Sequence, residues 1–329
     1  MPVPPSAGAA LDDLIERLHR GQPRAIGQAI TLCENDAVRR RDLIGRLFPD
    51  TGRAALIGVT GPPGAGKSTL VDRLAQHYRK SGERVGILAV DPTSPFSGGA
   101  ILGDRIRMQS HYLDSGVFIR SMATRGSMGG LARATLDAVD VLDAAGFDRI
   151  LVETVGAGQD EVDVVRGVDT VLVVTPPGLG DDIQAIKAGI MEIADVFVIN
   201  KADRDDADRT ARDLKMALGL AEGKAEGWRP PVLKTIASRA VGIAEVADAV
   251  AAHQGWLEQS GELADRRAAS LRLRVENLLK ERILDQADRI VGLDREMARA
   301  VAERTDPYRV ADRLFEGVIE SWPSGQGES

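Results

Sequence analysis

The stretch Gly61-Pro62-Pro63-Gly64-Ala65-Gly66-Lys67-Ser68 decides the fold class of this chain, because it matches the pattern GxxxxGK[ST] in full. It follows an apolar run at 54–60 and precedes a helical pattern that begins at residue 68, which is the context that this motif requires. Its glycines let successive backbone N–H groups turn inward around an anion, and the start of the helix adds its positive dipole end. The stretch therefore predicts a phosphate-binding loop between a buried strand and a helix.

Strand-like runs alternate with helical patterns on both sides of this loop. The runs predict seven buried strands, at Ala54–Thr60, Arg84–Val90, Val117–Ser121, Arg149–Glu153, Thr170–Thr175, Val196–Asn200 and Val232–Ala237. Helical patterns lie between them, including Ser68–Lys80, Gly130–Ala145, Ile183–Ile193 and Asp206–Leu218. This alternation is typical of an α/β fold with a mostly parallel central sheet covered by helices on both faces. Ligands of such sheets bind beyond the carboxyl ends of the strands, so we expect the functional motifs there.

Two helical segments flank this central region, which we predict to be a nucleotide-binding domain over 53–259. Residues 1–52 form an N-terminal extension, in which apolar spacing predicts three short helices broken near residues 21–23 and 35–36. Residues 260–329 are charged and helical. They are interpreted either as a solvated helical pair or as an oligomerisation arm, because their amphipathic faces need a partner.

The composition excludes several classes of protein. The chain has 329 residues and a single cysteine, Cys33, which excludes a disulfide framework and zinc motifs with several cysteines. A net charge of −7 argues against nucleic acid and anionic membranes as partners. Residues 1–10 lack the features of a secretory signal, and no apolar run approaches the ~20 residues of a membrane span. We expect a soluble, cytoplasmic protein.

A second motif, Asn200-Lys201-Ala202-Asp203, follows the predicted strand at 196–200 and matches NKxD. The carboxylate of Asp203 can accept two hydrogen bonds from the N1–H and N2–H₂ groups of guanine, whereas adenine offers no such donors. A carboxylate left unpaired by the wrong base is costly, so this residue predicts selectivity for guanine. Asn200 is expected to brace the loop, and the stem of Lys201 to lie along the base. The predicted ligand is GTP or GDP, with Lys67 on the β- and γ-phosphates and Ser68 on Mg²⁺.

Three acidic residues are candidates for the metal site. Asp91 and Glu153 end predicted strands, and Asp104 follows a Pro/Gly/Ser-rich stretch. Glu153-Thr154-Val155-Gly156 stands where G proteins have DxxG, so Gly156 is expected to sense the γ-phosphate. Ala157 follows it where many small G proteins carry the glutamine that orients water, and the nearest glutamine is Gln159. We therefore predict slow intrinsic hydrolysis that a partner accelerates.

Taken in order, the phosphate loop, VDPTSP at 90–95, GGAILGD at 98–104, ETVGAGQ at 153–159 and NKAD at 200–203 closely resemble the MeaB/ArgK-type G proteins. The resemblance implies a homodimeric GTPase chaperone of an adenosylcobalamin-dependent mutase of the methylmalonyl-CoA type. GTP would gate delivery of adenosylcobalamin from an adenosyltransferase and removal of damaged cofactor. The cobalamin itself is expected to bind the mutase, not this chain. The helices after residue 260 resemble the family's dimerisation arm.

The resemblance also implies roles for individual residues. Those expected to contact the nucleotide are Gly61, Pro62, Pro63, Gly64, Ala65, Gly66, Lys67, Ser68, Thr69, Asn200, Lys201, Asp203, Ala237 and Ser238. Those expected around Mg²⁺ are Ser68, Asp91, Asp104 and Glu153, and those expected to act in hydrolysis are Lys67, Glu153 and Gly156. An additional switch loop that relays the nucleotide state is expected to include Gly178, Gly180, Asp181, Asp182 and Lys187.

One position departs from the G-protein pattern. Counting back from Gly242, the serine of the last base-binding loop falls on Ile236, which Ala237 and Ser238 follow. We expect the N–H of Ala237 to bond guanine O6, and the brace that serine supplies to be lost or taken over by Ser238. Guanine selectivity is then weaker than in relatives.

Three other functions are weighed against this one. A nickel-type metallochaperone would carry histidine or cysteine clusters, whereas His19, His77, His111 and His253 are isolated in the sequence. An ATP-dependent kinase of an amino-acid transport system would prefer ATP, against the expectation from Asp203. A binding module that never hydrolyses its nucleotide would show no single-turnover GTP hydrolysis. Which acyl-CoA mutase is served stays open between the methylmalonyl-, isobutyryl-, ethylmalonyl- and 2-hydroxyisobutyryl-CoA enzymes.

Overall fold

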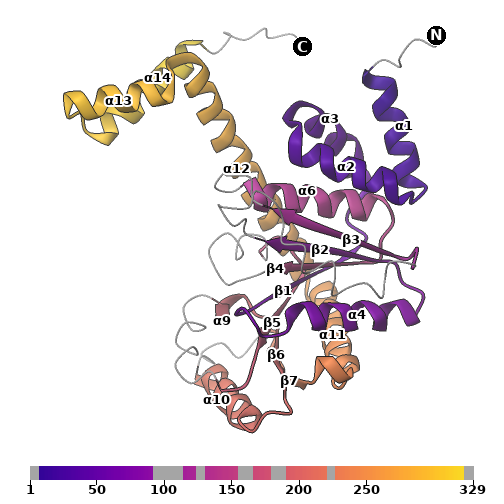
Figure 1. The fold of residues 1–329 in the computed structure, drawn as a ribbon. Helices are drawn as coiled ribbons and strands as arrows, with labels where there is room; N and C mark the ends of the chain where they lie inside the picture. Colours follow the sequence, from indigo (N-terminus) through magenta and orange to yellow (C-terminus); the bar gives the residue numbers. More distant parts are fainter. Residues whose placement is uncertain are drawn as a thin grey trace. The chain divides into compact units, whose positions relative to one another are not determined.

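The computed structural model describes residues 7–91, 114–123, 130–154, 166–178, 190–220 and 227–321. The chain divides into two compact units, Met1–Arg267 and Ala268–Ser329. The first unit holds the sheet and its covering helices, and the second is helical wherever its structure is described, apart from the short turns that join its helices (Figure 1).

The first unit is built on one parallel sheet. In the described ranges its strands are β1 (Ala55–Thr60), β2 (Val85–Asp91), β3 (Val117–Ala123), β4 (Arg149–Thr154), β5 (Thr170–Thr175), β6 (Val196–Asn200) and β7 (Val232–Thr235). Their order is β3-β2-β4-β1-β5-β6-β7, and every pairing is parallel. β1 lies between β4 and β5, where the chain switches direction across the sheet, the position at which such folds bind ligands. The predicted α/β class is confirmed.

Helices cover both faces of this sheet (Figure 1). On one face, α4 (Lys67–Lys80) and α11 (Ile243–Ser260) bury apolar side chains against strand residues such as Ile57, Leu172 and Val198. On the other face, α6 (Gly130–Ala144) and α10 (Ala207–Leu220) pack against alternate strand residues such as Leu88, Val173 and Phe197. The short helix α9 (Ile190–Ile193) precedes β6. Strands buried on both faces account for the continuous apolar runs in the sequence.

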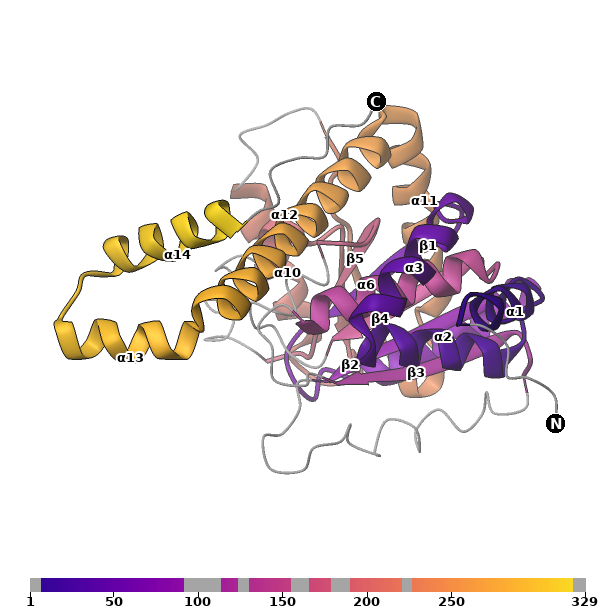
Figure 2. The same ribbon diagram turned by 90° about the horizontal axis from the view of Figure 1, so that it is seen from above.

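The N-terminal helices form a third layer over α6, as Figure 2 shows from above. They are α1 (Ala7–His19), α2 (Pro23–Asn35) and α3 (Ala37–Leu47), followed by a 3₁₀ turn, η1 (Phe48–Asp50). The apolar face of α2, which includes Ile26, Ile30 and Cys33, is fully buried, and Arg40 of α3 lies 3.7 Å from the carboxylate of Asp137 in α6. Burial, with help from nearby Asp137, raises the pKa of the Cys33 thiol, so this cysteine stays protonated and acts as a small apolar side chain.

The amino-terminal edge of the sheet carries a group of residues that we call the clamp: Asp169, Asp195 and His253, which are buried, and Arg266 and Arg267, which are partly exposed. Arg266 donates to both oxygens of Asp195, at 2.8 and 2.9 Å, and Arg267 donates to both oxygens of Asp169, at 3.0 and 3.1 Å. His253 is fully buried and its Nε2 lies 3.2 Å from Oδ1 of Asp195. These bidentate pairs tie the first turns of α12 (Glu262–Val291) to the segments that precede β5 and β6.

The clamp carboxylates also accept hydrogen bonds from backbone amides near the starts of β1 and β5. Asp169 accepts the amide of Leu56 at 3.1 Å, and Asp195 accepts that of Val171 at 2.8 Å. Burial by itself raises the pKa of Asp195, but hydrogen bonds from His253 and Arg266 outweigh it and hold that pKa below its ordinary value of 3.8. Asp195 therefore remains ionised at neutral pH despite its burial.

The second unit contains the rest of α12 with α13 (Leu293–Glu303) and α14 (Pro307–Ser321). Three helices, not the predicted pair, thus occupy the described part of residues 260–329, because Gly292 and Arg304 end helices in left-handed or related conformations. Arg313 pairs with buried Glu296 at 2.9 Å and joins α14 to α13. Many apolar side chains of this unit remain exposed, including Leu271, Val275, Leu278, Leu279, Ile283, Val301, Phe315 and Ile319.

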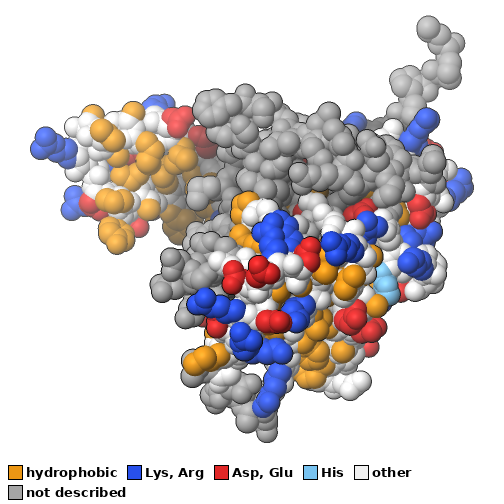
Figure 3. All heavy atoms as spheres, turned by 60° about the horizontal axis from the view of Figure 1, so that its bottom comes forward, with side chains coloured by type: hydrophobic (Ala, Val, Ile, Leu, Met, Phe, Trp, Pro, Cys, Tyr) orange, Lys and Arg blue, Asp and Glu red, His pale blue; other side chains and the backbone are white. Residues whose placement is uncertain are grey.

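The surface seen from the β7 side, in Figure 3, mixes Lys and Arg with Asp and Glu over the first unit. Among the helices whose residues are described, none has the length and apolar character needed to cross a membrane.

Candidate nucleotide-binding site

The loop at 61–66 joins β1 to α4 and depends on two glycines with positive φ. Gly61 has φ +138°, and a Cβ there would lie 2.0 Å from the carbonyl oxygen of Val174 in β5. Gly66 has φ +92°, and a Cβ there would lie 2.3 Å from Nδ2 of Asn200. Neither contact is tolerable, so both positions need glycine for conformation and for space. Pro62, Pro63, Gly64 and Ala65 form the turn between them.

Lys67 begins α4 and is buried beneath the loop. Its ammonium group donates to the carbonyls of Gly61 at 2.7 Å and Pro62 at 3.1 Å, which places the charge at the mouth of the loop. Ser68 and Thr69 follow in the first helical turn, where backbone N–H groups lack partners within the helix. The loop thus combines a cation with amides that have no partner within the helix, which is the chemistry that holds an anion.

Two of the four predicted metal ligands, Ser68 and Glu153, meet where β4 ends beside β1. The hydroxyl of Ser68 donates to Oε1 of Glu153 at 2.6 Å, and only 4% of Glu153 is exposed. A hydroxyl and a buried carboxylate are oxygen donors of the kind that Mg²⁺ prefers, so these two residues fit that ion. Asp91 ends β2, the strand next to β4. The side chain of Asp91 and the whole of Asp104 and Gly156 lie outside the described residues.

Asn200, at the end of β6, joins the two predicted motifs. Its Nδ2 donates to the carbonyl of Ala65 at 2.9 Å, across 135 residues of sequence. Its Oδ1 accepts from the hydroxyl of Thr235 at 3.1 Å and from the amide of Ala237 at 3.0 Å. The side chain therefore fixes the phosphate loop against the loop that follows β7.

Lys201 and Asp203 lie next to this junction. Lys201 has φ 61°, an uncommon conformation for a residue with a side chain, and its ammonium group donates to the carbonyl of Gly64 at 2.6 Å. Asp203 is partly exposed and lies 4.0 Å from the guanidinium of Arg239. The structure thus brings the NKxD motif and the phosphate loop into direct contact.

One detail of the loop that follows β7, residues 236–241, which we call the base loop, differs from the prediction. Ala237 was expected to offer its N–H to guanine O6, but that N–H donates to Asn200 instead. The chain leaves β7 at Thr235, two residues earlier than predicted, and turns into a 3₁₀ helix at Ala237–Arg239. Ser238, the next residue, is exposed, whereas Ala237 is buried.

Of the predicted switch-loop residues, Gly178 lies within the described part of the chain. Gly178 is exposed with φ +89°, and its amide donates to the hydroxyl of Thr210 in α10 at 3.2 Å. Gly180, Asp181, Asp182 and Lys187 lie outside the described residues. Sequence reasoning missed Arg73 of α4, which contacts the base loop, and Thr235, which fixes Asn200. Neither belongs to a recognised motif, and only their contacts across the fold reveal them.

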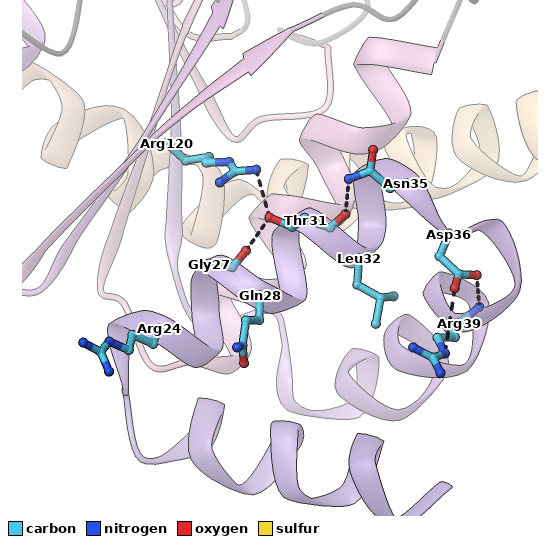
Figure 4. Close-up of a pocket in the computed structure, with 9 residues that line it drawn as sticks. All are labelled: Arg24, Gly27, Gln28, Thr31, Leu32, Asn35, Asp36, Arg39 and Arg120. Carbon is cyan, nitrogen blue, oxygen red and sulfur yellow. Dashed lines mark hydrogen bonds and ion pairs between the residues drawn. The ribbon is translucent and has the colours of Figure 1, made fainter. Parts of the chain in front are cut away.

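A separate hollow of about 560 Å³ lies between α2, the start of α3 and β3 (Figure 4). Arg120 of β3 donates to the hydroxyl of Thr31 there at 3.1 Å and pairs with Glu34. None of the predicted nucleotide or metal residues lines it. Elsewhere in the described ranges, no group of three or more His, Cys, Asp or Glu side chains is arranged to hold a metal ion.

Comparison with models of known protein families shows the family of this chain. A family model described as "Methylmalonyl Co-A mutase-associated GTPase MeaB" matches residues 26–290. The chain belongs to the MeaB family. Its members are P-loop GTPases, so the loop at 61–68 and the NKxD motif stand in a GTPase.

Individual relatives agree with this membership. A Pyrococcus abyssi protein named as a GTPase is 52% identical over 314 residues, which cover 94% of this chain and 97% of that protein. The mouse protein "Methylmalonic aciduria type A homolog, mitochondrial" is 37% identical, with 84% of this chain and 70% of that protein covered. A solved structure of a LAO/AO transport system kinase is 28% identical with a TM-score of 0.72, covering 96% of this chain and 99% of that one.

Proposed function

We propose that this MeaB-family GTPase is a chaperone of an adenosylcobalamin-dependent acyl-CoA mutase of the methylmalonyl-CoA type. Binding and hydrolysis of GTP gate the delivery, protection and reactivation of the mutase's cofactor, and the cobalamin binds the mutase alone. The observation that carries the proposal is the family match over residues 26–290. The name of the mouse relative, which refers to methylmalonic aciduria, supports the same class of partner.

Each end of the nucleotide has its own set of residues. Lys67 and the amides of the loop hold the phosphates, while Asp203 reads the guanine edge beside Lys201. Ser68 and Glu153, with Asp91 and Asp104, hold Mg²⁺, which when bound neutralises charge on the phosphate oxygens. The 2.6 Å contact between Ser68 and Glu153 supports this assignment. Gly156 senses the γ-phosphate.

Hydrolysis by the isolated chain is slow, since Ala157 stands where many G proteins carry a water-orienting glutamine. The mutase accelerates it, and the loop from Gly178 through Gly180, Asp181 and Asp182 to Lys187 relays the nucleotide state. A cobalamin adenosyltransferase supplies the cofactor to the complex, which acts in the cytoplasm.

The chain functions as a homodimer through its C-terminal helices. The exposed apolar side chains of the second unit, among them Leu271, Val275 and Leu278, support this, because an unpartnered apolar surface of that extent marks an interaction site. The segments 1–52, 53–259 and 260–329 then serve as extension, GTP-binding domain and dimerisation arm.

The decisive experiment measures GTP hydrolysis with and without a purified mutase, together with capture of the mutase in GDP and in a non-hydrolysable GTP analogue. We expect roughly tenfold or greater stimulation and capture that depends on the nucleotide. Lys80→Gln, an exposed change at the far end of α4, serves as the control that retains both properties. Unchanged hydrolysis together with capture that ignores the nucleotide would refute the proposal.

The similarity to the transport system kinase favours one second candidate, a protein kinase that uses ATP. Turnover of GTP and ATP separates the two functions directly, because the carboxylate of Asp203 favours guanine. Preference for ATP with transfer of phosphate to a protein would support the kinase instead.

A further inference from the structure

Two of the backbone amides in the base loop after β7 already have hydrogen-bond acceptors within the protein. The amide of Ala237 donates to Asn200 Oδ1 at 3.0 Å, and the amide of Arg239 donates to the carbonyl of Ile236 at 2.9 Å. Between them, the amide of Ser238 lies in the first turn of the 3₁₀ helix, where N–H groups have no partner within the helix. Ser238 is also exposed. Its N–H is therefore the amide of this loop best placed to meet a ligand.

Arg73 of α4 donates hydrogen bonds to the backbone carbonyls of this loop. It lies two turns into α4, and its Nε donates to the carbonyl of Ala237 at 3.2 Å while its Nη2 approaches that of Ser238 at 3.5 Å. Its Nη1 donates to Gln76 at 2.8 Å, and Gln76 in turn donates to Asp72 at 2.9 Å. The guanidinium is thus fixed on its own helix and grips a loop that follows it by 164 residues.

Peptide geometry turns this grip into an orientation. In a trans peptide the C=O of one residue and the N–H of the next point in opposite directions within one rigid plane. The carbonyl of Ala237 points to Arg73, so the N–H of Ser238 must point away from α4. Fixing the carbonyl therefore fixes the direction of the donor.

We propose that Arg73 is a positioning residue for guanine recognition, which holds the peptide unit between Ala237 and Ser238 so that the Ser238 N–H donates to guanine O6. The inference rests on the proposed guanine site at Asp203. It accounts for two features of the loop: Ile236 carries no polar group in the position of the usual serine, and the amide of Ala237 is already engaged by Asn200. Arg73 itself does not touch the base.

The test compares the binding of GDP with that of 6-thio-GDP, IDP and ADP to the full chain. 6-Thio-GDP replaces O6 with sulfur, a weak acceptor, and reports on the loop amide. IDP lacks the 2-amino group and reports on Asp203. In the wild type we expect GDP to bind about fivefold more tightly than 6-thio-GDP, the factor of one net hydrogen bond. In Arg73→Gln the ratio of the affinities for GDP and 6-thio-GDP should fall toward one. The ratio of the affinities for GDP and IDP should be unchanged.

Two further variants serve as controls for this experiment. Arg73→Lys keeps a cationic donor and should retain at least half of the wild-type preference for GDP over 6-thio-GDP, and Lys80→Gln should retain all of it. The inference is overturned if Arg73→Gln keeps the full preference, or if both ratios fall together, since the latter means general damage to the pocket. A wild type that fails to distinguish GDP from ADP and IDP would instead refute the guanine site itself.

Discussion

Charged residues lie at both the amino-terminal and the carboxyl-terminal edge of the central sheet, but their contacts differ. At the amino-terminal edge, Asp169 and Asp195 are buried and each is matched by an arginine that donates to both of its oxygens. At the carboxyl edge, Lys67 rests on carbonyl groups of its own loop, and Glu153 rests on the hydroxyl of Ser68. One edge is held by bidentate ion pairs, and the other places a cation and a carboxylate beside the phosphate loop.

The difference separates stability from function. Breaking a buried ion pair leaves an uncompensated charge and is strongly destabilising. A cation beside a phosphate loop at the start of a helix is placed to bind a ligand of opposite sign. We therefore expect substitutions at the amino edge to change the free energy of unfolding, and substitutions at the carboxyl edge to change nucleotide binding and hydrolysis.

The largest effect is expected for Lys67→Ala. It removes the cation that faces the phosphates, so single-turnover GTP hydrolysis should fall by roughly 10³-fold, about 4 kcal/mol. Urea unfolding without nucleotide should change by less than ~1 kcal/mol, because hydrogen bonds to loop carbonyls contribute little net stability. A large loss of stability in the nucleotide-free protein would break the proposed separation of the two edges.

Asp195→Asn tests the other edge. The amide cannot compensate the charge of Arg266, so the free energy of unfolding should fall by about 3 kcal/mol, while the affinity for GDP changes less than about threefold. Asp208→Asn is the matched control, because Asp208 forms an exposed pair with Lys234 and its loss should leave the unfolding midpoint unchanged. Loss of GDP binding in the folded Asp195→Asn variant would contradict the comparison.

Asp203→Asn sharpens the description of the carboxyl edge. An amide in place of the carboxylate loses the paired hydrogen bonds to guanine, so GDP affinity should fall about 30-fold, about 2 kcal/mol. Xanthosine diphosphate, with a carbonyl where guanine has the amino group, should gain affinity. Calorimetric titration with both nucleotides measures the exchange, and equal losses for both would argue against a base contact.

The smallest effect concerns pH. Because the pKa of Asp195 is lowered in the folded state, its contribution to stability is present above its ordinary value of 3.8 and is lost as the pH falls through the folded value. The free energy of unfolding of the wild type should therefore decline below about pH 4, and Asp195→Asn should flatten that decline. Urea midpoints between pH 5 and 3 measure both slopes. Parallel slopes would show that another group dominates.

The sequence was sufficient for the fold class and for the contact between the phosphate loop and the NKxD motif. Local patterns predicted Thr170–Thr175 and Val196–Asn200 at their observed bounds, because strands buried on both faces leave unbroken apolar runs. The NKxD residues and the phosphate loop were also correctly expected to meet at one edge, since parallel strands share the direction of their carboxyl ends.

What sequence could not provide were the contacts between distant segments. The bond from Asn200 to Ala65 spans 135 residues, and that from Arg73 to Ala237 spans 164. The diversion of the Ala237 amide depends on where β7 stops, which is set by packing against β6 and the turn at Ile236–Val241. The clamp was missed for a similar reason, because Arg266 and Arg267 look like an ordinary basic pair on a helix.

The position of Asn200 along the chain has a consequence for synthesis. The ribosome completes the phosphate loop first, Asn200 about 130 residues later, and the base loop only after residue 235. Domains fold as their last strand emerges, so a nascent chain that ends before β7 lacks every partner that holds Oδ1 of Asn200. Under the proposed function, the ability to tell one purine from another is thus acquired last, after the loop proposed to receive the phosphates has already been made.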